Sequence, residues 1–159
     1  MATYNLLRHI SDYLIAQNLV RDPKVAGPQT GGPYPLWLEP RLGAPGPRGE
    51  KEAVEVWTND DMAVSAYRDG GIPPPRGAPW RTLFVEFWLR SKNPPIAFAF
   101  WDSLIPHFQA DSPSGNPRQA YDLAGLFIME SVMIRELGRL QSDDQAFTYS
   151  GAFSFTTYA

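Results

Sequence analysis

Residues 81–108 read RTLFVEFWLRSKNPPIAFAFWDSLIPHF, and this segment divides into a strand, a corner and a helix. The strand, residues 83–90, is rich in β-branched and aromatic residues and contains neither Gly nor Pro, so its side chains alternate between two faces. One face is apolar and the other is half polar. The apolar face carries Val85, Phe87 and Leu89, and the other face carries Phe84, Glu86, Trp88 and Arg90.

The prolines after this strand predict where the helix begins. Pro94-Pro95 forces the preceding residues into an extended conformation, and Pro95 suits the first turn of a helix. We expect a helical segment at about 95–108, regular from Ile96 to Leu104, because Pro106 pushes Ile105 toward extension. Its apolar residues lie on roughly one face: Ala97, Phe100, Trp101, Leu104 and Phe108. The helix must therefore fold back onto the sheet to bury both apolar faces.

Periodicity predicts the elements at the two ends of the chain. Residues 4–20 have apolar residues at spacings of three and four, which predicts a helix that ends at Asp22-Pro23. Residues 146–157 alternate strictly, as a strand does. One face of that strand carries an aromatic row: Phe147, Tyr149, Phe153 and Phe155, with Gly151 in the middle. We interpret the row as core or interface, and a platform for a small ligand is the alternative.

The remaining strands are shorter or ambiguous. Residues 35–40 predict a short edge strand, and residues 53–58 and 62–68 predict a pair of strands joined by a turn. Residues 126–137 have apolar residues in both alternating sets, which favours a strand covered on both faces. A helix is the alternative, since Leu, Met and Glu favour helices. We expect turns or loops at 69–79, 109–122 and 138–145.

These elements predict one domain over residues 1–159 with an α+β fold. We expect a mostly antiparallel β-sheet, with the N-terminal helix and the helix at about 95–108 packed on one face. Residues 23–50 interrupt this pattern, because almost half of them are Pro or Gly, a density that excludes long helix and continuous sheet. This segment is either a surface loop or an arm that contacts a neighbouring chain.

Composition excludes several classes of function. The net charge is −3, which argues against binding DNA by bulk charge, and there is no cysteine for disulfides or thiolate chemistry. The two histidines, His9 and His107, lack metal-ligand spacing, and Asp60-Asp61 suits a turn. We therefore expect no catalytic residue, metal site or cofactor, and hence no enzyme. We also expect no signal peptide and no membrane span.

Three segments resemble the tail terminator (tail completion) proteins of long-tailed bacteriophages. The first is the strand Val85 to Ser91, which leads into Pro94-Pro95-Ile96-Ala97 and the helix. The second is the late strand around Ile134 with the following residues 137–144. The third is the closing strand, with Ser150-Gly151-Ala152-Phe153-Ser154-Phe155. The opening helix also agrees with this resemblance.

The resemblance implies a structural protein of the virion, made in the host cytoplasm and assembled as a homo-hexameric ring. Such a ring caps the tail tube protein and presents a surface to the head–tail connector or stopper, and DNA passes through its lumen without specific binding. Another connector or stopper ring, or a tail tube protein, is the alternative within the same class. A small ligand-binding α+β domain is the alternative from a different class.

Ring assembly requires contacts between different faces of neighbouring subunits. The arm at residues 23–50 offers reach, and aromatic and arginine side chains are favoured at interfaces. We predict the segment from Tyr34 to Arg48 as a contact to an adjacent subunit or ring. Its candidate interface residues are Tyr34, Trp37, Arg41 and Arg48.

Overall fold

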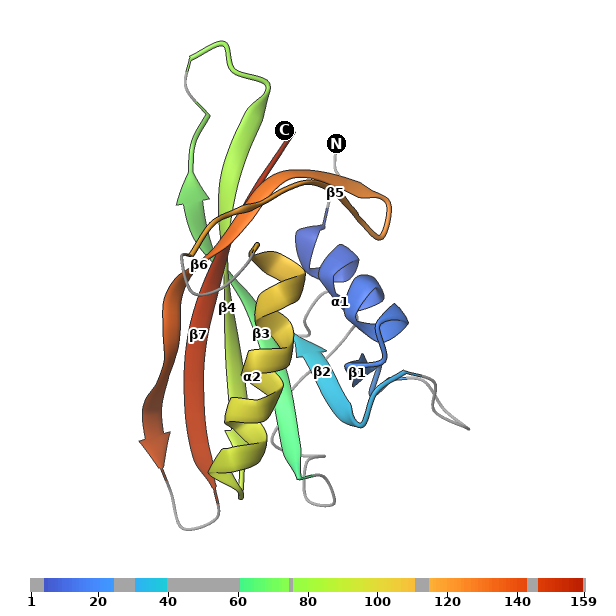
Figure 1. Ribbon diagram of the computed structural model, residues 1–159, viewed down its shortest axis with the longest axis vertical. Coiled ribbons are helices and arrows are strands. Elements are labelled where there is room, and N and C mark those ends of the chain that lie inside the picture. Colours follow the sequence, from blue (N-terminus) through green and yellow to red (C-terminus); the bar gives the residue numbers. More distant parts are fainter. Residues whose placement is uncertain are drawn as a thin grey trace.

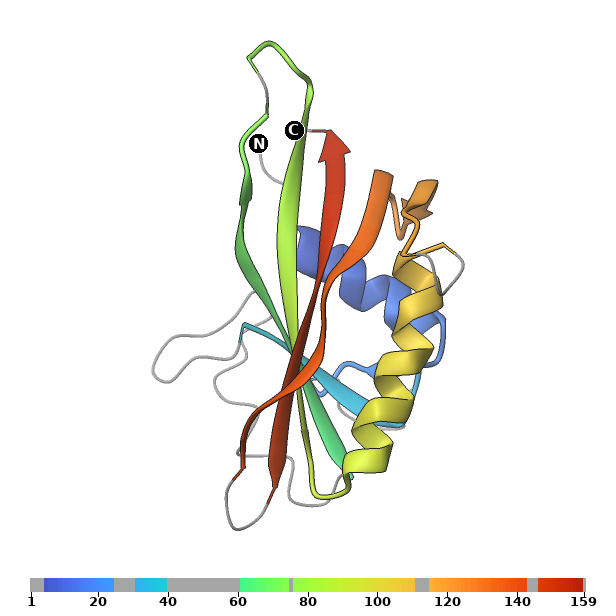
Figure 2. The same cartoon turned by 60° about the vertical axis from the view of Figure 1, so that its left-hand side comes forward.

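The computed structural model describes residues 5–24, 31–39, 61–74, 76–110, 115–142 and 146–158. These residues form a curled seven-stranded sheet with two helices on its concave side, which is an α+β fold (Figures 1 and 2). The helices are α1 (Leu6–Ala16) and α2 (Pro94–Phe108), and the strands are β1 (Val20–Arg21), β2 (Tyr34–Leu38), β3 (Met62–Ile72), β4 (Trp80–Ser91), β5 (Arg118–Leu123), β6 (Leu126–Ser142) and β7 (Phe147–Tyr158).

The sheet is mostly antiparallel, as the sequence predicted. Its strand order is β1-β2-β3-β4-β7-β6-β5. Only β1–β2 and β2–β3 are parallel pairs. β4 and β7 lie side by side along their full lengths, from Trp80 opposite Tyr158 to Ser91 opposite Phe147. The two strands with the clearest alternation in the sequence therefore form the centre of the sheet.

The core lies between β4, β7 and the two helices. The predicted apolar face of β4 is buried at Val85, Phe87 and Leu89, and the predicted apolar face of α2 is buried in full. Burial of each large apolar side chain stabilises the fold by about 1.5–3 kcal/mol. This burial confirms the prediction that the helix folds back onto the preceding strand.

The aromatic row of β7 belongs to this core. Tyr149, Phe153 and Phe155 are buried, and Phe153 contacts Trp101 of α2 with ring centroids 4.9 Å apart. A Cβ atom at Gly151 would lie 2.4 Å from the Trp101 ring. The Trp101 ring therefore occupies the space that a side chain at position 151 would fill, and the row offers no open platform for a ligand.

Pro106 lies inside α2, so the prediction that regular helix ends at Leu104 is wrong. Proline removes one backbone hydrogen bond and crowds the preceding turn. Leu104 and Phe108, on either side of it, are both completely buried. Their burial outweighs the cost of the proline, and the helix continues to Phe108.

The end of α1 also differs from the prediction. The helix stops at Ala16 rather than continuing to residue 20, and Asn18 has φ +60°, a left-handed conformation that asparagine tolerates better than most residues. Val20–Arg21 then forms β1, which pairs with Tyr34 and Pro35 of β2. The predicted strand at 35–40 is therefore confirmed as β2, but it is not the edge of the sheet because β1 lies outside it.

Residues 126–137 form a strand, so the helical alternative is wrong. β6 continues beyond the predicted turn at Gly138 and reaches Ser142 through several irregularities of register. It is not covered on both faces, because the helices cover only one side of the sheet. Its exposed apolar residues are Phe127, Ile134 and Leu140.

Two segments predicted as loops contain strand. Arg118–Leu123 is β5, which pairs with β6 through a turn at Ala124-Gly125. β3 continues from the predicted residues 62–68 to Ile72, after a bulge between Arg68 and Gly71. Hairpin pairing with the next strand in the chain stabilises both segments despite their polar or Gly-rich sequences. Residues 40–50 of the segment predicted as a loop or arm, and the predicted strand at 53–58, lie outside the described residues.

Candidate functional site

The described residues contain no group of three His, Asp or Glu that could hold a metal ion. No helix among them is long and apolar enough to cross a membrane. The candidate sites are therefore two polar clusters and two apolar surfaces.

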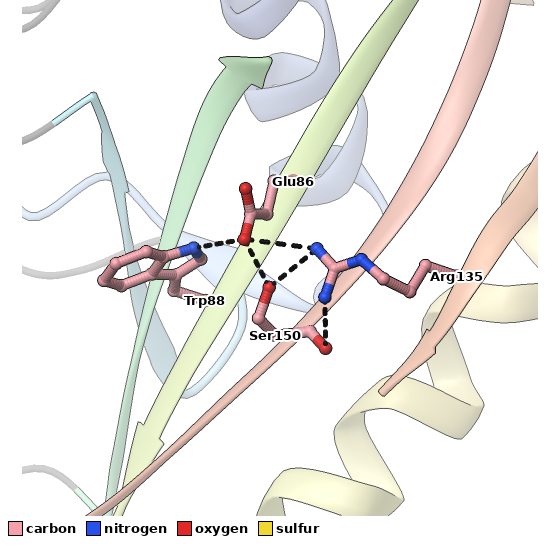
Figure 3. Close-up of polar contacts among 4 residues, drawn as sticks. All are labelled: Glu86, Trp88, Arg135 and Ser150. Carbon is pink, nitrogen blue, oxygen red and sulfur yellow. Dashed lines mark hydrogen bonds and ion pairs between the residues drawn. The ribbon is translucent and has the colours of Figure 1, made fainter. Parts of the chain in front are cut away.

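The first polar cluster joins three strands on the sheet face opposite the helices (Figure 3). Oε1 of Glu86 on β4 accepts hydrogen bonds from Ser150 Oγ of β7 (2.6 Å) and from Trp88 Nε1 (2.8 Å). Arg135 of β6 lies 3.1 Å from the same oxygen and also donates to Ser150 Oγ at 3.0 Å. The carboxylate therefore links β4, β7 and β6.

The electrostatics of this cluster do not suit catalysis by Ser150. Burial raises the pKa of Glu86, but the hydrogen bonds from Ser150 and Trp88 and the charge of Arg135 outweigh burial and hold the pKa below its ordinary value of 4.5. A carboxylate with a lowered pKa is a weak general base for a serine hydroxyl. The cluster therefore fixes the register of three strands rather than activating a nucleophile.

The second polar cluster lies where α1, α2 and β5 meet. Arg118 Nη1 donates to the Tyr13 hydroxyl oxygen (3.2 Å) and to the His107 carbonyl (2.7 Å). The Tyr13 hydroxyl lies 2.9 Å from His107 Nδ1. The Tyr13 hydroxyl therefore bonds to both Arg118 and the His107 ring, and links α1 to α2 and β5.

Burial and then the charge of Arg118 lower the pKa of His107 below its ordinary value of 6.5. The Arg118 guanidinium also lies 4.0 Å from the Tyr121 ring centroid. Burial raises the pKa of Tyr121 to about 12, and its hydroxyl lies 2.6 Å from Ser131 Oγ. These contacts, with the hydrogen bond from Ser131 Oγ to the Phe108 carbonyl (2.9 Å), dock the β5–β6 hairpin against the helices.

The first apolar surface is at the end of the sheet where β4 begins and β7 ends. Trp80 of β4 pairs with Tyr158 of β7, and the Phe127 ring of β6 stacks on Tyr158 with centroids 6.0 Å apart. Ile72 of β3 pairs with Thr82, two residues from Trp80 along β4. All four apolar side chains are exposed, from 37% for Trp80 to 57% for Ile72. Sequence alternation could not reveal this surface, because it depends on the pairing of four strands.

The second apolar surface is a groove of about 470 Å³ beside α2. It lies among the residues that follow α1, the start of β2 and the first half of α2. Its lining is mainly apolar and comprises Asn18, Leu19, Pro33, Tyr34, Pro95, Ile96, Ala99, Phe100 and Ser103.

The predicted interface residues are not brought together on one free surface. Trp37 is 6% exposed, and its side chain lies on the face of β2 opposite the core residues Leu36 and Leu38. Tyr34 is half-buried, lines the groove and meets Phe100 edge to face, with centroids 5.7 Å apart. Arg41 and Arg48 lie outside the described residues. Of the four candidates, Tyr34 is the one seen at a surface that another molecule could contact.

No known protein family matches this sequence, and a search of curated proteins finds no similar protein.

Proposed function

We propose that this chain is a ring-forming structural protein of a bacteriophage tail, a tail terminator. The observation that carries the proposal is the exposed apolar surface formed by Ile72, Trp80, Phe127 and Tyr158 at one end of the sheet. Single exposed apolar residues are ordinary, but a group on adjacent strands marks a site of protein contact. The two polar clusters of the described residues hold the sheet and helices together. Assembly is therefore better supported than catalysis or ligand binding by these clusters.

The proposal includes the partners that the sequence resemblance implies. Six copies form a ring that caps the tail tube protein and meets the head–tail connector or stopper, within the neck of the virion. The net charge of −3 supports a lumen through which DNA passes without specific binding. The part of the Pro/Gly-rich segment around Arg41 and Arg48 acts as an arm toward an adjacent subunit or ring, since Tyr34–Leu38 is a strand of the sheet.

The alternative of a small ligand-binding domain used the aromatic row of β7 as its binding face. Tyr149, Phe153 and Phe155 are buried under the helices, so that face is closed. Alternatives within the same class, a connector or stopper ring and a tail tube protein, share the ring contacts and differ in their neighbours.

The mass of the purified protein in solution, measured by light scattering, tests the proposal. We expect a hexamer, or a monomer that becomes a ring when it meets the end of a tail. Electron microscopy of tails and virions distinguishes the alternatives, since a terminator stays on the tail tip, a connector stays on the head, and a tube protein forms long polymers. A protein that is monomeric in solution and absent from tails and virions would contradict the proposal.

A further inference from the structure

The β3–β4 hairpin, residues 68–80, projects past the rest of the molecule, and we call it the hairpin arm (Figures 1 and 2). Apart from half-buried Ala78, each of its described residues is exposed, and Ile72 is 57% exposed. An isolated two-stranded hairpin is only marginally stable in water. An arm that shows a large apolar side chain to solvent gains stability when a partner covers it.

The groove beside α2 has the size and chemistry to accept such an arm. Its volume, about 470 Å³, is that of a small-molecule pocket, roughly 300–1,000 Å³, which is room for a few side chains at the end of the arm. Pro95, Ile96, Ala99 and Phe100 give it an apolar wall.

The hairpin arm is too far from the groove of its own chain to enter it. The arm leads into the first residue of β4, Trp80, whereas α2 begins just after the last residue, Ser91. A 12-residue strand is roughly 36–40 Å long, so the arm and the start of α2 lie at opposite ends of the molecule (Figure 1). A hairpin arm that enters this groove must therefore come from another copy.

The charges beside the two surfaces are complementary. Arg76 is exposed at the tip of the hairpin arm, and Asp102 is exposed on α2 next to Ser103 of the groove. Neither side chain forms an ion pair within the described part of the chain. An arm lying in the groove would bring an arginine and a carboxylate of different copies together.

We propose that the hairpin arm of one copy docks in the α2 groove of the next copy, with Ile72 in the apolar groove and Arg76 beside Asp102. This inference rests on the proposed function and names the contact that builds the ring. The two surfaces differ, so the contact is heterologous and generates a closed ring or an open chain rather than a two-fold dimer.

Cysteine cross-linking tests the contact directly, because the chain has no cysteine of its own. Ile72→Cys and Ile96→Cys are made in separate proteins, mixed and oxidised. We expect disulfide-linked dimers in the mixture and none from either protein alone. Ala99→Cys, at an exposed position of the same groove, is the second partner for Ile72→Cys if Ile96→Cys folds poorly by circular dichroism. No cross-link from either mixture at high protein concentration would overturn the docking.

Charge reversal provides an independent test. Arg76→Asp and Asp102→Arg should each weaken self-association about tenfold in sedimentation velocity, and the double variant should recover most of it. Ile72→Ser should weaken association, whereas Ile72→Leu should preserve it. Equal effects of Ile72→Ser and Ile72→Leu, or no recovery in the double variant, would overturn the docking.

The outcomes separate this inference from the proposed function. Rings on tail tips without a cross-link between arm and groove would refute the docking and leave the tail role in place. Cross-linked copies of a protein that never joins a tail or virion would support the docking and refute the tail role.

Discussion

At the scale of single residues, Gly151 shows how one missing side chain positions a helix. The Trp101 ring occupies the space where a β-carbon would project from the middle of β7. Trp101 in turn packs against Phe153, which is completely buried. The glycine is therefore part of the contact between α2 and the sheet.

We expect Gly151→Ala to destabilise the fold by about 1–3 kcal/mol, because the added methyl group overlaps Trp101 in a packed core. Urea denaturation measures the change in the free energy of unfolding. Gly138→Ala on β6 is the matched control, since a Cβ atom there meets nothing within 4 Å. Equal stability of the two variants would refute the role of Gly151.

The lowered pKa of His107 predicts that the stability of the fold depends on pH. Its pKa in the folded protein lies below 6.5, so the unfolded chain binds the proton first as pH falls. The free energy of unfolding should therefore decrease as pH falls below about 6.5 and be independent of His107 above that pH. The contribution of Glu86, whose pKa is also lowered, is lost only at lower pH, below 4.5.

Urea denaturation of the wild type and of His107→Gln at pH 7.5 and pH 5.5 isolates the histidine. The glutamine variant should lose less stability between the two pH values than the wild type. An identical loss in both proteins would show that His107 does not titrate as its surroundings indicate.

At the scale of elements, the Glu86 cluster holds together three strands that are far apart in sequence. Ser150 and Trp88 depend on the carboxylate as their acceptor, and the Glu86 side chain is 19% exposed. Arg135 is 48% exposed, so solvent screens its charge. The hydrogen bonds of Glu86 should therefore matter more than the ion pair.

We expect Glu86→Ala to lower the free energy of unfolding by about 2 kcal/mol, because it leaves two part-buried donors without their acceptor. Arg135→Ala should cost less, about 0–1 kcal/mol. Glu136→Ala, at an exposed position of β6, is the control and should be close to neutral. A larger loss for Arg135→Ala than for Glu86→Ala would show that the ion pair dominates.

Helix α2 contains an internal proline, Pro106, whose cost is offset by the packing of the helix against the sheet. Pro106→Ala restores a backbone donor and relieves the crowding of the preceding turn, so it should stabilise the protein by up to about 3 kcal/mol. Pro95→Ala should give no such gain, because a backbone N–H in the first turn of a helix has no acceptor within that helix. Thermal unfolding followed by circular dichroism compares the two variants. A loss of stability in Pro106→Ala would show that the proline helps to order the end of the helix.

At the scale of the whole molecule, helices cover one side of the sheet (Figure 2). One end of the sheet exposes apolar residues to solvent. The segment predicted as an arm, residues 23–50, includes β2, which is integrated into the sheet. Within this segment, the candidates for intersubunit contact are Tyr34, which lines the groove, and the part around Arg41 and Arg48, which lies outside the described residues.

Deletion of residues 42–49 should therefore weaken assembly and leave the circular dichroism spectrum of the monomer unchanged. Sedimentation velocity measures assembly, and Ile72→Ser provides a comparison at a different surface. Full assembly of the deletion variant would show that this segment does not contact a neighbour.

The sequence alone determined the elements whose patterns are local. Alternation identified the apolar faces of β4 and β7, and helical spacing identified the buried face of α2, because side-chain burial repeats with the period of each element. These patterns also predicted that the second helix folds back onto the sheet. The predicted strand began at Pro35, one residue after Tyr34, so the sequence neither placed Tyr34 on β2 nor showed that it lines a groove.

Only the tertiary structure decided where elements end and which side chains meet. Pro106 stays helical because two buried neighbours hold it, and the polar β5 becomes a strand because β6 pairs with it. Glu86 and Ser150 are 64 residues apart in the chain, yet their side chains lie 2.6 Å apart. Contacts of this kind depend on the packing of the whole fold, and no local pattern of apolar and polar residues encodes them.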